Sequence, residues 1–181
     1  MKEIGFTQIK ADPCCYLWHQ GEEFDILLVW VDDIIFIVSS TTRNDAVEQD
    51  LSGKFEIKAL GQPKMLLGMG ICQNPEDNSI KLFQTAYIDS LLKKHGLEDA
   101  NPVSTPMDLN TKLDHDLNNP NDPVTKRDLS KCASASYATL IGLLMYLAIG
   151  TRPDIAYSVQ CLAKFTQDPK PVHWTAVKRI F

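Results

Sequence analysis

The strongest constraint in this sequence is an apolar stretch, residues 24–38, that carries two adjacent aspartates near its middle. Apart from Asp25 and the pair Asp32 and Asp33, every residue in the stretch is aliphatic or aromatic. It is too interrupted by charge to match the roughly 20 apolar residues of a membrane-spanning helix. Two strands of about five residues, buried on both faces and joined at the aspartates, fit the pattern best. The sequence therefore predicts a hairpin with acids where the strands meet.

The two neighbouring carboxylates, Asp32 and Asp33, are unusual in such apolar surroundings. Like charges a few ångströms apart in a low dielectric raise each other's pKa unless a cation intervenes. A tight two-residue turn also favours Asn-Gly or Asp-Gly, because both of its central positions need positive φ. Two interpretations stay open: a solvent-facing β-turn, where Asp is common, and a divalent-metal site at the tip of a rigid hairpin.

A metal site at this hairpin would suit Mg²⁺, which takes one or two protein carboxylates together with substrate phosphates. Side chains alternate along a strand, so adjacent aspartates do not point to one metal pair unless the turn rotates them. We therefore expect Asp32 to be the principal ligand and Asp33 the secondary one. Two-metal phosphoryl transfer needs at least one further carboxylate. Neither Asp12 nor Asp25 stands at a spacing that recommends it.

The rest of the chain predicts an α+β fold: an antiparallel sheet with packed helices, then a long linker and a helical region. The expected elements, in chain order, are a strand at 14–18, the hairpin, a helix at 41–53, strand pieces at 55–60, 64–72 and 80–83, and a helix at 85–96. We expect Thr41 or Thr42 to cap the first helix and Gly53 to close it in a left-handed conformation. Thr85 should cap the second helix.

The second half of the chain changes character at about residue 98. Residues 98–135 are polar and broken by four prolines, which predicts a linker. Residues 136–181 return to apolar positions at helical spacing and predict packed helices. The expected divisions are therefore 1–97, 98–135 and 136–181.

Composition narrows the possible partners and environment. The 18 Lys and Arg residues against 23 Asp and Glu give a net charge of -5, so no overall basic field gathers nucleic acid. Any polyanion must then be held by local cations or by metal. Five cysteines without a CxxC pair, and no N-terminal signal pattern, indicate a reducing intracellular compartment. We expect no membrane association.

Several blocks, taken in order, resemble one known family. The run Leu27 to Phe36 resembles the aromatic-Val-Asp-Asp hairpin of reverse transcriptases, specifically those of copia-type long-terminal-repeat retrotransposons. Further blocks in compatible order are Ala11-Asp12-Pro13-Cys14, Leu67-Gly68, Val103-Ser104-Thr105-Pro106-Met107 and Thr151-Arg152-Pro153-Asp154-Ile155. The resemblance extends over nearly the whole chain.

This resemblance implies a reverse transcriptase palm in residues 1–97 and a connection region in 136–181. It implies RNA-directed DNA polymerase chemistry with Mg²⁺ or Mn²⁺, on an RNA or DNA template-primer and deoxynucleoside triphosphates. Asp32 and Asp33 would be the catalytic, metal-binding pair. Trp30, a substrate-binding candidate, occupies the position where the family usually has tyrosine. Gly70 stands where the family tends to carry an acidic residue, and a glycine there is expected to loosen its hairpin.

The resemblance also implies parts of a parent polyprotein that we do not expect in this chain. These are the fingers, the first metal-binding aspartate on an upstream strand, and a ribonuclease H domain downstream. The complete protein would work in the cytoplasm, in a virus-like particle. We expect the isolated chain to lack polymerase activity, because an incomplete carboxylate set does not hold both metals.

Two alternatives accompany this hypothesis. Arg152 is the best candidate for contact with a nucleic-acid backbone, but Arg152-Pro153-Asp154 is also typical of a helix start, with Asp154 near the positive end of the dipole. The whole chain could instead be a catalytically inactive transposon remnant that acts at most as a protein-binding module, through apolar surfaces left uncovered.

Overall fold

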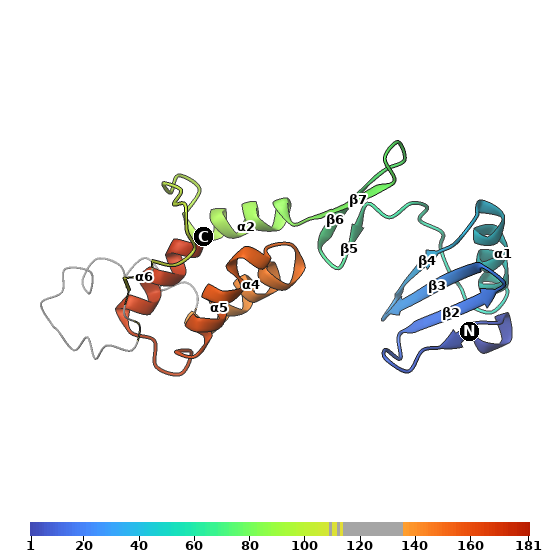
Figure 1. Ribbon diagram of the computed structural model, residues 1–181, viewed down its shortest axis with the longest axis horizontal. Coiled ribbons are helices and arrows are strands. Elements are labelled where there is room, and N and C mark those ends of the chain that lie inside the picture. The colour runs from blue at the N-terminus through green and yellow to red at the C-terminus, as the bar shows by residue number, and fades with distance from the viewer. Residues whose placement is uncertain (109, 112, 114–135) are drawn as a thin grey trace, which may run out of the picture. The chain divides into compact units, whose positions relative to one another are not determined.

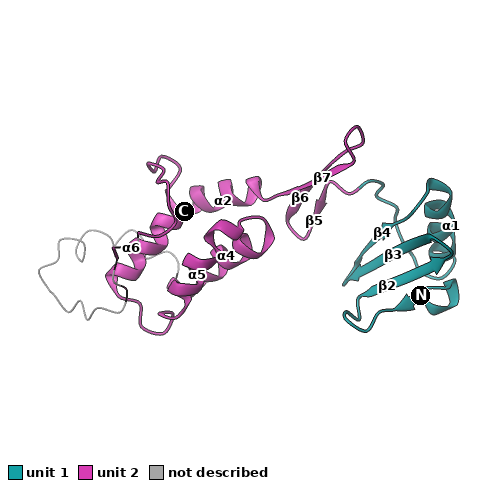
Figure 2. Cartoon of the chain, viewed as in Figure 1, with its two compact units in different colours: residues 1–62 teal, residues 63–181 magenta. Residues whose placement is uncertain are grey.

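The computed structural model describes residues 1–108, 110–111, 113 and 136–181. Most of the predicted linker, 98–135, lies outside these described residues. The chain forms two compact units, Met1–Gln62 and Pro63–Phe181 (Figure 2). Sheets and helices occur in both, so the predicted α+β fold is confirmed. No helix in the described ranges is long and apolar enough to cross a membrane.

The first unit is built on a four-stranded antiparallel sheet (Figure 1). A short 3-10 helix, η1 (Lys2–Ile4), comes first. The strands follow in spatial order as β1 (Thr7–Gln8), β2 (Cys15–Gln20), β3 (Glu23–Trp30) and β4 (Asp33–Ile37). The hairpin predicted for residues 24–38 is therefore confirmed, with Trp30 paired to Asp33 next to the turn.

One face of this sheet carries the core of the first unit. Helix α1 (Thr41–Ser52) buries Val47 and Leu51 in one cluster with Phe6 and Leu27. Side chains alternate along β3, so its other face lies away from this cluster. There Phe24 and Trp30 are 54% and 56% exposed. The expectation that these strands are buried on both faces is wrong in the described structure, where the helix covers only one side.

Helix α1 begins and ends differently from the sequence prediction. Ser40, not Thr41 or Thr42, is the N-cap, and its hydroxyl accepts a hydrogen bond from the backbone N–H of Arg43. Gly53 ends the helix with φ of -69°, in the right-handed region, so the predicted left-handed closure is wrong. The backbone N–H of Gly53 still bonds to the carbonyl of Gln49, which satisfies the helix end without a reversal of φ.

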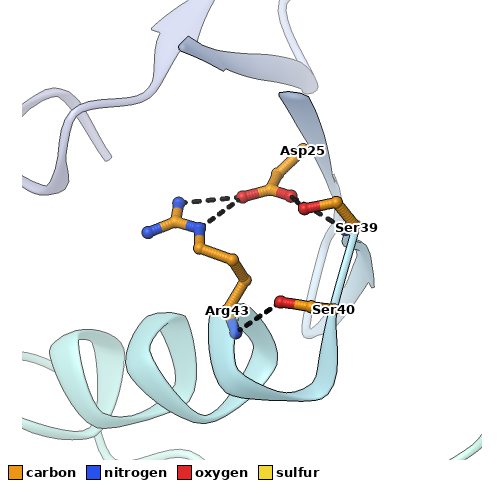
Figure 3. Close-up of polar contacts among 4 residues, drawn as sticks. All are labelled: Asp25, Ser39, Ser40 and Arg43. Atoms are coloured by element: carbon orange, nitrogen blue, oxygen red, sulfur yellow. Dashed lines mark hydrogen bonds and ion pairs between the residues drawn. The ribbon is translucent and has the colours of Figure 1, made fainter. Parts of the chain in front are cut away.

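A buried ion pair links the start of α1 to β3 (Figure 3). The Asp25 side chain is fully buried, and one of its oxygens accepts from Nε and Nη2 of Arg43, both at 2.8 Å. The other oxygen accepts from the backbone N–H of Ser39 at 3.0 Å and from its hydroxyl at 3.3 Å. The guanidinium also lies 3.9 Å from the centroid of the Trp18 ring. These bonds compensate for taking the carboxylate out of water.

The second unit begins with a three-stranded antiparallel sheet made of β5 (Met65–Leu66), β6 (Met69–Asn74) and β7 (Ser79–Phe83). The predicted hairpin around residue 75 is confirmed by the pairing of β6 with β7. The strand predicted at 55–60 is wrong, because no strand forms there. Gly70 on β6 stands opposite Phe83 on β7, and the ring lies where a Cβ on Gly70 would be. The glycine therefore gives room to an aromatic ring, which fills the gap that was expected to loosen the hairpin.

The helices of the second unit pack around one core. They are α2 (Thr85–His95), α4 (Tyr137–Gly150), α5 (Ala156–Ala163), α6 (Pro171–Ile180) and a 3-10 turn, η2 (Pro153–Ile155). Helix α2 ends at Gly96, in line with the predicted range 85–96, and Gly96 has a left-handed φ of 64°; its N-cap is Gln84 and not Thr85. The most deeply buried side chains of this core are Leu144, Val159, Leu162 and Val177.

Side-chain hydrogen bonds join the small sheet to helix α4 and to Thr151 just after it. The hydroxyl of Tyr146 donates to the backbone carbonyl of Leu67 in the β5–β6 turn. Gln84 is 2% exposed, and its Oε1 accepts from the hydroxyl of Thr151 at 2.8 Å. Because Gly70 near the start of β6 pairs with Phe83 at the end of β7, Leu67 and Gln84 lie at the same end of the sheet, and the sheet is held to α4 at that end.

Replacing Gly70 with alanine should destabilise the second unit by about 1–3 kcal/mol, because the new methyl group overlaps the Phe83 ring. The matched control is Gly142→Ala in α4, where no atom lies within 4 Å of the added carbon. That change should stabilise by about 1 kcal/mol through helix propensity. Urea unfolding followed by circular dichroism measures both. A Gly70→Ala protein as stable as Gly142→Ala would contradict the packing described for Phe83.

Replacing Arg43 with methionine should cost about 3 kcal/mol, because the Asp25 carboxylate stays buried without its cation. Adding Asp25→Leu to that variant should recover part of the loss, since both charges are then gone. Lys54→Met is the control: it removes a cation from the exposed pair with Glu3 and should leave the urea midpoint unchanged. Equal losses of stability for Arg43→Met and Lys54→Met would show that the buried pair of Asp25 with Arg43 contributes no more than the exposed pair of Lys54 with Glu3.

Candidate functional site

The two candidate aspartates lie at the tip of the β3–β4 hairpin. Val31 and Asp32 are the two turn residues, and Asp33 is the first residue of β4. The strands thus meet one residue earlier than the sequence interpretation placed them, since only Asp32 is in the turn. Both aspartates are exposed, and in the described part of the chain no hydrogen bond or ion pair engages either carboxylate. They are available to a ligand from solution.

The turn itself has an unusual backbone. Val31 has φ of 54°, in the left-handed region, where β-branched residues are genuine outliers. Asp32 does not share this conformation, so positive φ occurs only at the first central position, as in type II′ turns. Glycine is the usual residue there. The side chain of Val31 is 83% exposed, so no burial within the described structure offsets the strain.

Trp30 lies beside the acids on the open face of the sheet. Trp30 and Asp33 are directly paired across the hairpin, and directly opposed residues project from the same face. The indole is 56% exposed. An accessible aromatic ring next to a carboxylate fits the expectation that Trp30 contacts a substrate, and the assignment stays a prediction.

Asp25 does not supply the further carboxylate that a two-metal site needs. It lies five residues before Trp30, roughly 17 Å along the strand, and on the opposite face from Asp33. Its oxygens are already used by Arg43 and Ser39. Sequence reasoning missed this pair because Arg43 stands 18 positions away. The only signal was a charge in the middle of an apolar strand.

Asp12 is also engaged locally. Its Oδ1 accepts from the backbone N–H of Cys14 at 2.8 Å, an Asx turn that leads into β2. The carbonyl of Cys14 accepts from the N–H of Val29, which places this loop at the same end of the sheet as the hairpin tip. Still, in the ranges the structure describes, no three His, Cys, Asp or Glu residues form a group that could hold a metal.

Arg152 lies in the second unit, between α4 and η2. Its Nε and Nη2 donate to the two carboxylate oxygens of Asp154, with the shortest contact at 2.7 Å. This contact lowers the pKa of the Asp154 carboxyl and raises that of the guanidinium. Both side chains are partly exposed. The geometry agrees with the helix-start alternative, and a role in substrate binding stays a prediction.

Comparison with known proteins gives a consistent family. Residues 1–109 match the sequence model described as reverse transcriptase (RNA-dependent DNA polymerase). The chain is 34% identical over 181 residues to the retrovirus-related Pol polyprotein from transposon TNT 1-94 of Nicotiana tabacum, covering 99% of this chain and 13% of that protein. It is 32% identical over 178 residues to the corresponding polyprotein from transposon RE1 of Arabidopsis thaliana, covering 98% and 11%.

A shorter relative matches as well. The uncharacterized mitochondrial protein AtMg00810 of Arabidopsis thaliana is 31% identical over 154 residues, which is 85% of this chain and 58% of that protein. No solved structure matches. The chain spans only 11–13% of the length of the transposon polyproteins. With more than half of its residues matched by one family model, the chain belongs to the reverse transcriptase family, as the reverse transcriptase region of a copia-type retrotransposon Pol polyprotein.

Proposed function

We propose that this chain carries part of the nucleotidyl-transfer site of an RNA-directed DNA polymerase, with Asp32 and Asp33 as metal ligands. The observation that carries the proposal is the pair of unengaged carboxylates at an exposed two-residue hairpin tip. Family membership supplies the reaction class. The partners would be an RNA or DNA template-primer and deoxynucleoside triphosphates, which the larger polyprotein would bind.

The donor atoms fit the metal that the family implies. Two carboxylates supply hard oxygens, and Mg²⁺ or Mn²⁺ binds such groups together with water and phosphate oxygens. When bound, the metal would polarise phosphate oxygens and favour attack by a primer hydroxyl. The hairpin would present the carboxylates of Asp32 and Asp33 to the metal without other protein groups bound to them. Trp30 beside them would offer a flat surface to a base or sugar.

The strained turn supports a functional role for the tip. A β-branched residue in the left-handed region costs about 1–2 kcal/mol, and Val31 gains no burial in return in the described structure. Residues held in sparsely populated φ/ψ regions cluster at active sites, where strain sets the positions of neighbouring groups. We infer that the strained backbone at Val31 fixes the relative positions of the Asp32 and Asp33 carboxylates.

The remnant hypothesis is a second candidate with an observation of its own. Large apolar side chains on the open face of the first sheet, including Leu17, Phe24 and Ile37, are 37%, 54% and 50% exposed. Exposed apolar patches of this kind mark interaction surfaces. Metal binding at the hairpin tip distinguishes the two candidates, because a protein-binding remnant has no need of it.

Asp32→Asn should abolish Mn²⁺ binding at the hairpin tip, and Asp33→Asn should weaken it about tenfold, because each change removes one charged oxygen ligand. Paramagnetic broadening of the amide signals of residues 30–34 measures the binding. Asp50→Asn, which removes an exposed carboxylate on α1, is the control and should leave the broadening intact. If Mn²⁺ broadens no signal at the tip of the unaltered chain, the metal assignment fails.

Primer extension tests the whole activity. The described residues bring no third acidic ligand to the pair, so the 181-residue chain alone should extend no primer with Mg²⁺ or Mn²⁺. The same chain within a longer polyprotein should extend it, and Asp32→Asn should abolish that activity. Processive incorporation by the chain alone would show that its own carboxylates complete the site.

Val31→Asn should stabilise the first unit by about 1 kcal/mol, because asparagine tolerates the left-handed region better than a β-branched residue. Val103→Asn is the matched control: Val103 is also exposed but has an ordinary φ, and its replacement should be close to neutral. Urea unfolding measures both. A loss of stability on Val31→Asn would show that the valine side chain, and not the backbone, determines the turn.

A further inference from the structure

The segment that follows helix α2, residues 101–108, contains the one hydroxyl residue in the sequence that stands directly before a proline. This residue is Thr105, followed by Pro106. The ring of Pro106 restricts Thr105 to extended backbone. Thr105 is exposed, and in the part of the chain that the structure describes no backbone–backbone hydrogen bond holds residues 101–107. The Thr105 hydroxyl therefore lies on an extended and accessible stretch of backbone.

The side chain of Arg179, in the last turn of α6, binds this segment. Its Nη2 donates to the Thr105 hydroxyl at 3.0 Å, and its Nε donates to the Thr105 carbonyl at 3.1 Å. Both acceptors are neutral, and among the described residues no carboxylate lies within 4.0 Å of this guanidinium. The positive charge of Arg179 is thus directed at Thr105 without an anion to pair with. A phosphoryl group on the Thr105 hydroxyl would supply that anion.

The surroundings of this contact suit a phosphate. A guanidinium binds two phosphate oxygens with two parallel N–H groups, which is a stronger contact than its present bonds to neutral oxygens. The end of a helix repels an anion through its dipole, but Lys178 and Arg179 both lie in the last turn of α6 and offset that repulsion. Met107, two residues after Thr105, packs against the core of the second unit. A tighter bond at Thr105 would therefore hold the segment on that core.

We propose that Thr105 is a phosphorylation site for a proline-directed protein kinase, and that Arg179 binds the phosphate and fastens residues 101–108 to α6. Kinases of this class bind an extended segment and require proline directly after the modified residue. The γ-phosphoryl group of ATP passes to the Thr105 hydroxyl oxygen, the bond from its phosphorus to the leaving ADP breaks, and the hydroxyl proton goes to the catalytic base of the kinase. The proposal rests neither on metal binding at the hairpin nor on polymerase activity.

Treatment of the full 181-residue chain with a purified proline-directed kinase and ATP, followed by peptide mapping, tests the site. One phosphate on Thr105 is expected. Ser104 is the internal control, because it is also exposed but has no proline directly after it, and it should stay unmodified. Pro106→Ala keeps the Thr105 hydroxyl and should lose most of the modification. A folded chain in which Thr105 stays unmodified, or equal modification of the Pro106→Ala variant, overturns the proposal.

The phosphorus NMR signal of the modified chain tests the part played by Arg179. A neighbouring guanidinium favours the doubly charged phosphate, so the pH at the midpoint of the phosphate titration should lie about half a unit below that of a free phosphorylated peptide of residues 101–108. Arg179→Met should remove this difference. Lys164→Met, which removes an exposed cation at the end of α5, is the control and should retain it. Phosphorylation should also lower the unfolding equilibrium constant about threefold, in the unaltered chain but not in Arg179→Met. A titration midpoint that Arg179→Met leaves unchanged would overturn the assignment of Arg179.

Discussion

The two-residue turn at Val31 and Asp32 sets the register between β3 and β4. Because Trp30 must pair with Asp33, every other side chain of β3 and β4 is assigned to a face. Leu27 and the buried Asp25 go to the core with α1, and Trp30 goes to the open face with Asp33. A slip of β4 by one residue against β3 would turn Asp33 toward the core and Ile34 and Phe36 away from it. The faces on which the two acids and the indole lie therefore follow from one tight connection.

Much of the fold could be predicted from sequence because its signals are local. Local sequence patterns predicted several strands and helices at the positions where they form. These patterns are the apolar run at 24–38, the breaks at Gly96 and around residue 75, and the helical spacing after residue 136. The errors came where a local pattern is ambiguous. An unbroken apolar strand reads as buried on both faces even when one helix covers only one of them. Thr41 and Thr42 have side chains that are nearly as favourable at an N-cap as the serine at position 40, so the sequence alone does not single out Ser40.

The residues of the candidate site could be singled out from the sequence, but their surroundings could not. Two acids in an apolar hairpin were enough to single out Asp32 and Asp33, and the resemblance to a family gave them a chemical role. The turn residue that carries the strain, Val31, gave no signal, because propensity alone argues against valine there. The pairing of Asp25 with Arg43 depends on tertiary structure, since a strand and a later helix must meet before the charges do. Long-range partners of this kind have no fixed sequence spacing.

The packing of Phe83 over Gly70 also constrains how this region can change over time. A side chain at position 70 and a large ring at position 83 compete for one volume, so neither position can vary freely while the other is fixed. A lineage that introduces an acidic residue at 70 must first shrink or displace the ring. The reverse path must lose the acid before the ring can settle. The two strands of this hairpin are thus linked in their mutational history, and the order of the steps decides which intermediates fold.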